Sequence, residues 1–341
     1  MHTTNRIEWI DYAKAIGIWL VIMGHILNVS RPIEGGLYTV IYSFHMPFFF
    51  FVSGLLFSTK KMPFGSFAIS KVKSLLVPYL LLNILCAVLC IPMYLCNAFP
   101  IADLHAPILD LLTLFDGNMG SKYAPPSWFL ISLFIVMMIR FFAEKCALHW
   151  RLLIMGIAIA MTYVLSMYKL PLSVDKIPGA YVFFSIGCLL HGKLRNIELS
   201  TARLALLALL LIALHIPLAL YNGPVHINEI LGHTGWLFWI VAVLGIAALV
   251  MTSELLSRLV NSAYIHTYIH TARRTMHIIG NYDYIMFARS AVELYDGLFP
   301  CQSLVPYPDD YARIYVRNSH ITAVYTDNKD NRTIHPYLKW L

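Results

Sequence analysis

Long, nearly uninterrupted runs of apolar residues dominate the first 250 positions of the chain. Most runs are close to the length of about twenty residues that a helix needs to cross the hydrocarbon core of a bilayer. A membrane β-barrel would instead show segments of about ten residues with alternating polarity. The eight clear runs are residues 9–29, 37–58, 74–96, 127–144, 150–168, 178–192, 201–221 and 233–251. The pattern therefore predicts an all-α, polytopic bundle of transmembrane helices.

Charged residues between these runs alternate in sign from one loop to the next. The basic set is Lys60, Lys61, Lys71, Lys73, Arg140, Lys145, Arg151, Lys193, Arg195 and Arg203, and the acidic set is Asp103, Asp110, Asp116, Asp175 and Glu229. Basic residues thus gather in every second loop. Because short cytoplasmic loops carry an excess of Lys and Arg, the N-terminus is predicted to be cytoplasmic.

The chain changes character near residue 255. Residues 256–290 hold one or two weak apolar spans, which charged residues interrupt. Residues 291–341 are polar and rich in Tyr, Asp and Asn. We therefore expect a membrane domain over residues 1–255, degenerate late spans after it, and then a polar tail. We interpret the tail as altered, through a shifted reading frame or a truncation, relative to a complete protein of this kind.

Composition narrows the function classes further. Hydrophobic residues make up 59% of the 341 residues and charged residues 13%, with a mean hydropathy of +0.67, whereas soluble domains carry about 25% charged residues. So little charge cannot cover the surface of a soluble enzyme. The net charge of +7 resides largely in the loops, so it indicates membrane topology and not nucleic-acid binding. The six cysteines contain no CxxC pair, which favours packing roles over a metal site or a disulfide framework.

The first apolar run carries ionisable side chains, which are costly in a bilayer and by default mark a function. Lys14 and His25 lie within roughly 20° of each other around a helix, and Asp11 lies within about 60° of that face. This polar stripe must face the bundle interior or a water-filled cavity. A structural ion pair would explain Asp11 and Lys14, whereas the deeper His25 favours a functional role.

The second run contains His45 beside an expected helix break. Pro47 removes a backbone donor and frees a carbonyl group one turn earlier, near Ser43. Counted from the predicted membrane surfaces, His25, His45 and His215 reach the outer half of the membrane at comparable heights. A histidine in a membrane helix can simply hydrogen-bond across the bundle. Three at one level could instead supply a general base and its supports, since neutral imidazole suits proton transfer near pH 7.

Two further cations, Lys71 and Lys73, lie at the predicted cytoplasmic start of the third run. By composition alone, such a pair is more often a determinant of topology. The same charges could also hold the phosphate groups of an anionic cofactor that arrives from the cytoplasm.

Several of these segments resemble motifs of the acyltransferase 3 family of integral membrane O-acyltransferases. Residues 11–25 (DYAKAIGIWLVIMGH) resemble its opening helix, and residues 43–54 (SFHMPFFFFVSG) resemble its second signature. Residues 71–79 are similar to its basic segment before the third helix. Trp128-Phe129-Leu130 and residues 183–187 (FFSIG) resemble later motifs in the same order. The nearest branch is the one described as fucose 4-O-acetylase-like.

The resemblance covers about residues 7–255 and implies transfer of an acyl group, usually acetyl from acetyl-CoA. It implies a carbohydrate or glycolipid hydroxyl as acceptor, at the bacterial inner (cytoplasmic) membrane. By motif it makes His25 catalytic, His45 a second active-site residue, and Lys71 and Lys73 the residues on the CoA side. The family's basic segment often holds an Arg-x-x-Arg arrangement, from which this chain departs. Lysine offers charge to phosphate but not the planar fork of arginine.

Four residues are expected to support this site: Asp11, Lys14, Trp128 and His215. No metal is expected. Direct transfer to the acceptor and a covalent acyl-histidine intermediate are both chemically open.

Two other classes of protein remain as alternatives. One is a transporter or exporter of a sugar or lipid, in which Asp11, Lys14 and His25 form a proton relay. Transporters of this kind usually contain paired repeats, and no internal repeat is visible across the eight runs. The other is a non-catalytic membrane component of polysaccharide assembly.

Overall fold

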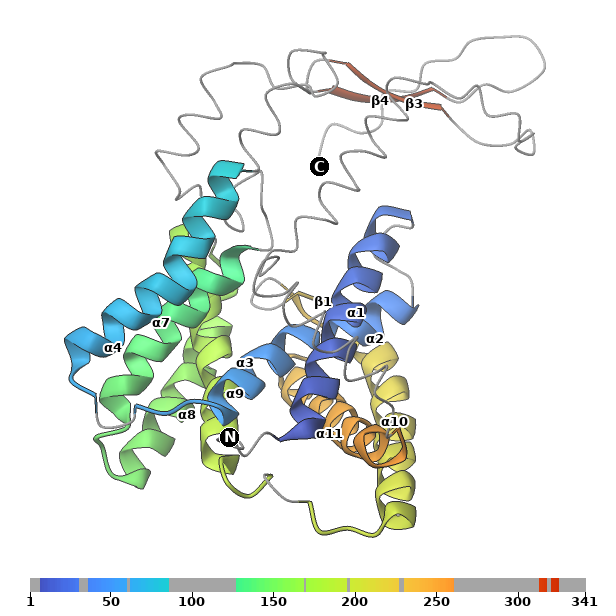
Figure 1. Cartoon of the computed structure of the whole chain (residues 1–341). Helices are drawn as coiled ribbons and strands as arrows, with labels where there is room; N and C mark the ends of the chain where they lie inside the picture. Colours follow the sequence, from blue (N-terminus) through green and yellow to red (C-terminus); the bar gives the residue numbers. More distant parts are fainter. Residues whose placement is uncertain are drawn as a thin grey trace, which may run out of the picture. The chain divides into compact units, whose positions relative to one another are not determined.

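The computed structural model describes residues 7–30, 36–59, 62–85, 127–168, 170–194, 197–226, 230–260, 313–317 and 320–324 (Figure 1). The chain divides into two compact units, Met1–Leu294 and Tyr295–Leu341, each described by itself. The weak spans predicted over residues 256–290 lie outside the described residues from position 261 onward.

The first unit is mainly helical. Its elements are α1 (Glu8–Ser30), α2 (Gly36–Tyr42), α3 (His45–Leu55), α4 (Phe64–Lys71), the π-helix η1 (Val72–Leu76), α7 (Trp128–Ala143), α8 (Leu148–Leu165), the 3₁₀-helix η3 (Pro171–Lys176), α9 (Ile177–Leu190), α10 (Thr201–Asn222) and α11 (Gly235–Leu259). The helix after η1 continues to residue 85. Each of the eight apolar runs thus contains helix, and the second run is divided between α2 and α3.

Among the residues that the structure describes, five helical stretches are long and apolar enough to cross a membrane. They are Gly36–Leu55, Phe64–Leu85, Leu148–Leu165, Thr201–Asn222 and Gly235–Leu259, and a shorter apolar helix spans Trp128–Ala143. These stretches agree with a helical membrane protein. The predicted number of eight spans and the cytoplasmic N-terminus stay predictions.

The centre of the bundle is the contact between α3 and α9, with α4, α7 and α8 on one side and α1, α2, α10 and α11 on the other (Figure 1). The two central helices approach at glycines. A Cβ added at Gly54 would collide with the carbonyl oxygen of Phe184, and one added at Gly187 would collide with that of Phe51. Small residues that let two backbones touch are typical of helix contacts in membranes.

The described residues also form two pairs of short antiparallel strands. In the first unit, β1 (Val225–His226) pairs with β2 (Ile230–Leu231) between α10 and α11. In the second unit, β3 (Arg313–Arg317) pairs with β4 (His320–Val324), with Arg313 opposite Val324.

Candidate active site

The second apolar run breaks at Ser43 and Phe44, one turn before Pro47. Proline in the first turn of α3 lacks the N–H that would have continued the ladder from α2. Two side chains at the break bond to carbonyl groups near the end of α2. The Ser43 hydroxyl donates to the carbonyl of Val40 at 2.8 Å, and Nδ1 of His45 lies 2.9 Å from that of Ile41.

His45 is only 4% exposed and lies in the first turn of α3. Because the carbonyl of Ile41 can only accept, Nδ1 carries the proton, and Nε2 holds the lone pair in the neutral ring. The ring edge meets Tyr42 at a centroid distance of 4.6 Å, and Tyr42 in turn stacks on Tyr38 at 3.9 Å. The His45 imidazole therefore lies at the helix break beside Tyr42, whose ring stacks on Tyr38.

His215, on α10, lies at the same break. It is 3% exposed, and its Nδ1 lies 3.0 Å from the carbonyl oxygen of Val241 on α11. Its Nε2 is 3.4 Å from the Ser43 hydroxyl, and its ring meets Phe44 edge-on at 5.0 Å. Through these contacts the His215 side chain links α10 to α11 and to the break between α2 and α3.

His25 lies within α1, and its side chain is outside the described residues. The backbone before it is informative, because a Cβ added at Gly24 would lie 2.9 Å from Cε2 of Tyr42 and 3.4 Å from Cγ2 of Ile41. This turn of α1 therefore packs against the same Tyr42 ring that meets His45. The fold thus brings His45 and His215 to the α2–α3 break, and the turn of α1 that ends at Gly24, just before His25, packs beside it.

Asp11 and Lys14 do not belong to that meeting point. Both are half-buried on α1, and neither is without an interaction partner. Asp11 precedes Gly24 by thirteen residues, which is about 20 Å along a helix. The polar stripe of α1 therefore leads away from the break towards the start of the helix.

The two lysines of the predicted cofactor segment are not on one face. The ammonium of Lys71, which is half-buried at the end of α4, lies 5.5 Å from the centroid of Phe67. Lys73 is exposed on η1. Residues two apart on a helix do not face each other, so the structure separates the pair.

Trp128 begins α7 beside a group of buried polar residues that the sequence reasoning missed. The ammonium of Lys176 lies 5.0 Å from the Trp128 ring centroid, and both Asp175 and Lys176 are buried. Next to Trp128, the Ser127 hydroxyl accepts a hydrogen bond from the Asn83 amide at 3.3 Å. One feature of the sequence could have indicated this group. Lys176 is a cation in a loop that is predicted to lie on the outer, cation-poor side of the membrane.

Apolar helices long enough to cross a membrane, with buried histidines at a break within one of them, are typical of an integral membrane protein with an internal polar site. The model of the acyltransferase domain, the acyltransferase 3 family, matches residues 7–287. The chain therefore belongs to this family and is a membrane acyltransferase. The match includes the α2–α3 break, the lysines and Trp128. No curated protein and no solved structure matches the chain.

Proposed function

We propose that this chain is an O-acyltransferase of the fucose 4-O-acetylase-like branch. It transfers acetyl from acetyl-CoA to a hydroxyl group of a carbohydrate or glycolipid, at the inner membrane of a bacterium. The observation that carries the proposal is the meeting of His45, His215 and the Gly24 turn of α1 at one helix break. Such a site can supply the proton transfer that acylation of a hydroxyl requires.

The reaction needs one base and one path for the leaving thiolate. An imidazole Nε2, for which His25 is the first candidate, takes the proton of the acceptor hydroxyl as its oxygen attacks the thioester carbonyl carbon. The new C–O bond forms, the C–S bond breaks, and the CoA thiolate leaves and takes up a proton. His45 acts as the second active-site residue, and its Nδ1 bond to Ile41 fixes the ring and the tautomer.

Polar groups lie at two well-separated positions along one helical stretch, which supports one binding region for the acyl donor and another for the acceptor. Lys71 lies at the end of α4, and Asn83 lies twelve residues later on the same stretch, about 18 Å away at helical rise. Asn83 contacts Ser127, which precedes Trp128. In this arrangement the phosphates of the donor bind near Lys71, and the hydroxyl acceptor approaches from the end that holds Trp128 and Lys176.

The test compares O-acetyl content of surface polysaccharide, by mass spectrometry, in a deletion strain that carries the wild-type gene or a variant. His25→Ala is expected to abolish the O-acetyl signal. His149→Ala, which changes an exposed histidine at the start of α8, is expected to keep it. Immunoblots of the membrane fraction verify equal amounts of each protein.

The outcome also separates the proposal from its rivals. A transporter with a proton relay would change the amount of exported polysaccharide, and not its acetyl content per sugar. A non-catalytic assembly component would tolerate His25→Ala in both measurements. Either result, at equal membrane levels, would refute the proposed activity.

A further inference from the structure

Four phenylalanines form a contact between the start of α4 and the end of α7. Phe64 lies 5.3 Å from Phe141 and 4.8 Å from Phe142, between ring centroids. Phe67 lies 4.9 Å from Phe141. Phe67 and Phe141 are buried, whereas Phe64 is 39% and Phe142 51% exposed. Two buried rings thus support two rings that offer part of their faces to the outside.

Two lysines lie over this aromatic contact, Lys71 from the end of α4 and Lys145 from the turn after α7. The ammonium of Lys145 is 5.2 Å from the centroid of Phe141 and 5.8 Å from that of Phe142. The ammonium of Lys71 is 5.5 Å from the centroid of Phe67. Lys71 and Lys145 therefore lie over two rings, Phe67 and Phe141, that contact each other. We refer to Phe64, Phe142, Lys71 and Lys145 as the Phe–Lys surface.

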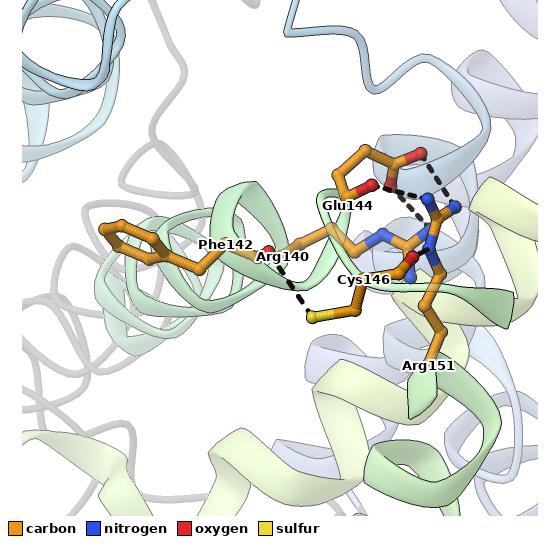
Figure 2. Close-up of polar contacts among 5 residues, drawn as sticks. All are labelled: Arg140, Phe142, Glu144, Cys146 and Arg151. Carbon is orange, nitrogen blue, oxygen red and sulfur yellow. Dashed lines mark hydrogen bonds and ion pairs between the residues drawn. The ribbon is translucent and has the colours of Figure 1, made fainter. Parts of the chain in front are cut away.

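The turn that carries Lys145 is held by arginines, as Figure 2 shows. Arg140, only 2% exposed, pairs with the Glu144 carboxylate at 2.7 Å. Arg151 donates to the same carboxylate at 3.0 Å and to the carbonyl of Cys146 at 2.8 Å.

The Glu144 carboxylate is therefore occupied by two guanidinium groups. Within the described part of the chain no carboxylate pairs with Lys145, whose charge lies over the rings.

We propose that the Phe–Lys surface binds the adenosine and phosphate end of the acyl-CoA donor, an inference that rests on the proposed function. Exposed phenyl faces stack flat heteroaromatic rings, as they do with nucleic-acid bases. Lys145 binds the 3′-phosphate beside the adenine. Lys71, which lies one turn after Phe67 on α4, binds the pyrophosphate. Charge-assisted contacts to phosphate are the stronger class of hydrogen bond.

The same chemistry would suit the phosphate of an anionic lipid, so the lipid is controlled in the experiment. The full chain is placed in nanodiscs of phosphatidylcholine alone. Binding of acetyl-CoA, 3′-dephospho-acetyl-CoA and S-acetylpantetheine is then measured by calorimetry. Parallel nanodiscs contain phosphatidylglycerol.

Lys145→Gln is expected to raise the Kd of acetyl-CoA about five- to tenfold, the loss of one charge-assisted phosphate contact. The Kd of 3′-dephospho-acetyl-CoA should stay within about twofold of wild type, because Lys145 loses no partner there. Phe142→Leu, which keeps an apolar side chain, should weaken both nucleotides and leave S-acetylpantetheine unchanged. Lys193→Gln and Trp150→Leu change an exposed lysine and an exposed aromatic elsewhere and should leave all three ligands unchanged.

Two results would overturn the inference while leaving the proposed function intact. One is wild-type affinity of Lys145→Gln for acetyl-CoA, and the other is an effect that appears only with phosphatidylglycerol, which would assign the surface to lipid. If the wild-type chain binds none of the three ligands, the donor assignment of the proposed function fails together with the inference. Gel filtration and thermal melting of each variant exclude misfolding as the cause.

Discussion

Nδ1 of His45 donates to the carbonyl oxygen of Ile41, 2.9 Å away, across the break between α2 and α3. This bond has a structural and a chemical effect. It satisfies a carbonyl at the end of α2, and it fixes the neutral ring with the lone pair on Nε2. An asparagine can reproduce the donor but not the basic nitrogen, so substitution separates the two effects.

His45→Asn is therefore expected to fold like the wild type and to lose acyl transfer by about 100-fold or more, the usual contribution of a positioned acid or base. His45→Ala should lose both transfer and thermal stability. The measurements are initial rates of acetyl transfer and melting temperatures in detergent. Near-wild-type rates in His45→Asn would show that His45 only closes the helix break.

His215 acts through other residues, because its two ring nitrogens contact Val241 and Ser43. His215→Leu removes both contacts, and the expected cost is about 1–3 kcal/mol of stability, as for other buried hydrogen bonds. Ser43→Ala keeps the bond to Val241 and should cost less. Denaturation midpoints measure the difference. A rate loss in His215→Leu as large as that in His45→Asn, without loss of stability, would instead place His215 at the reacting atoms.

Lys71 and Lys73 are expected to differ in their effect on the donor. Lys71 lies over Phe67, whose ring contacts α7, whereas Lys73 is exposed on η1. Lys71→Gln should raise the KM for acetyl-CoA about fivefold, equivalent to roughly 1 kcal/mol of phosphate binding. Lys73→Gln should leave it within about twofold, in the range of a surface charge. Equal effects of the two substitutions would restore the pairing inferred from the sequence.

The sequence predicted the helices well because their cause is local. A run of apolar residues must form helix in a bilayer to satisfy its own backbone, and α1 (Glu8–Ser30) agrees closely with the predicted span over residues 9–29. The break before α3 was also predictable, since Pro47 acts on its own backbone and on that of the preceding turn. The position of His45 at that break followed from the same residue.

Contacts between helices were harder to predict, because they depend on which faces meet. Nothing in the spacing of Lys71 indicated Lys145, since they are related only through the packing of Phe67 under Lys71 against Phe141 under Lys145. The burial of Lys176 against Trp128 likewise depends on how η3 meets α7. Only the positive charge of Lys176, in a loop predicted to lie on the outer, cation-poor side, could have indicated that this side chain is buried.

The crossing of α3 and α9 provides a test of the fold that does not depend on the proposed chemistry. A methyl group at Gly54 would overlap the Phe184 carbonyl, which is backbone and cannot rotate away. Gly54→Ala is therefore expected to separate the two helices and to cost about 1–3 kcal/mol or more, as overpacking does.

Gly156→Ala is the matched control, because a Cβ there meets nothing within 4 Å on α8. It should be neutral or stabilising by up to about 1 kcal/mol through helix propensity. Melting temperatures of the two purified variants measure the contrast. Equal stability of Gly54→Ala and Gly156→Ala would mean that α3 and α9 do not touch at Gly54. Because His45 lies on α3, the same loss of contact would remove the support that holds the helix break in place.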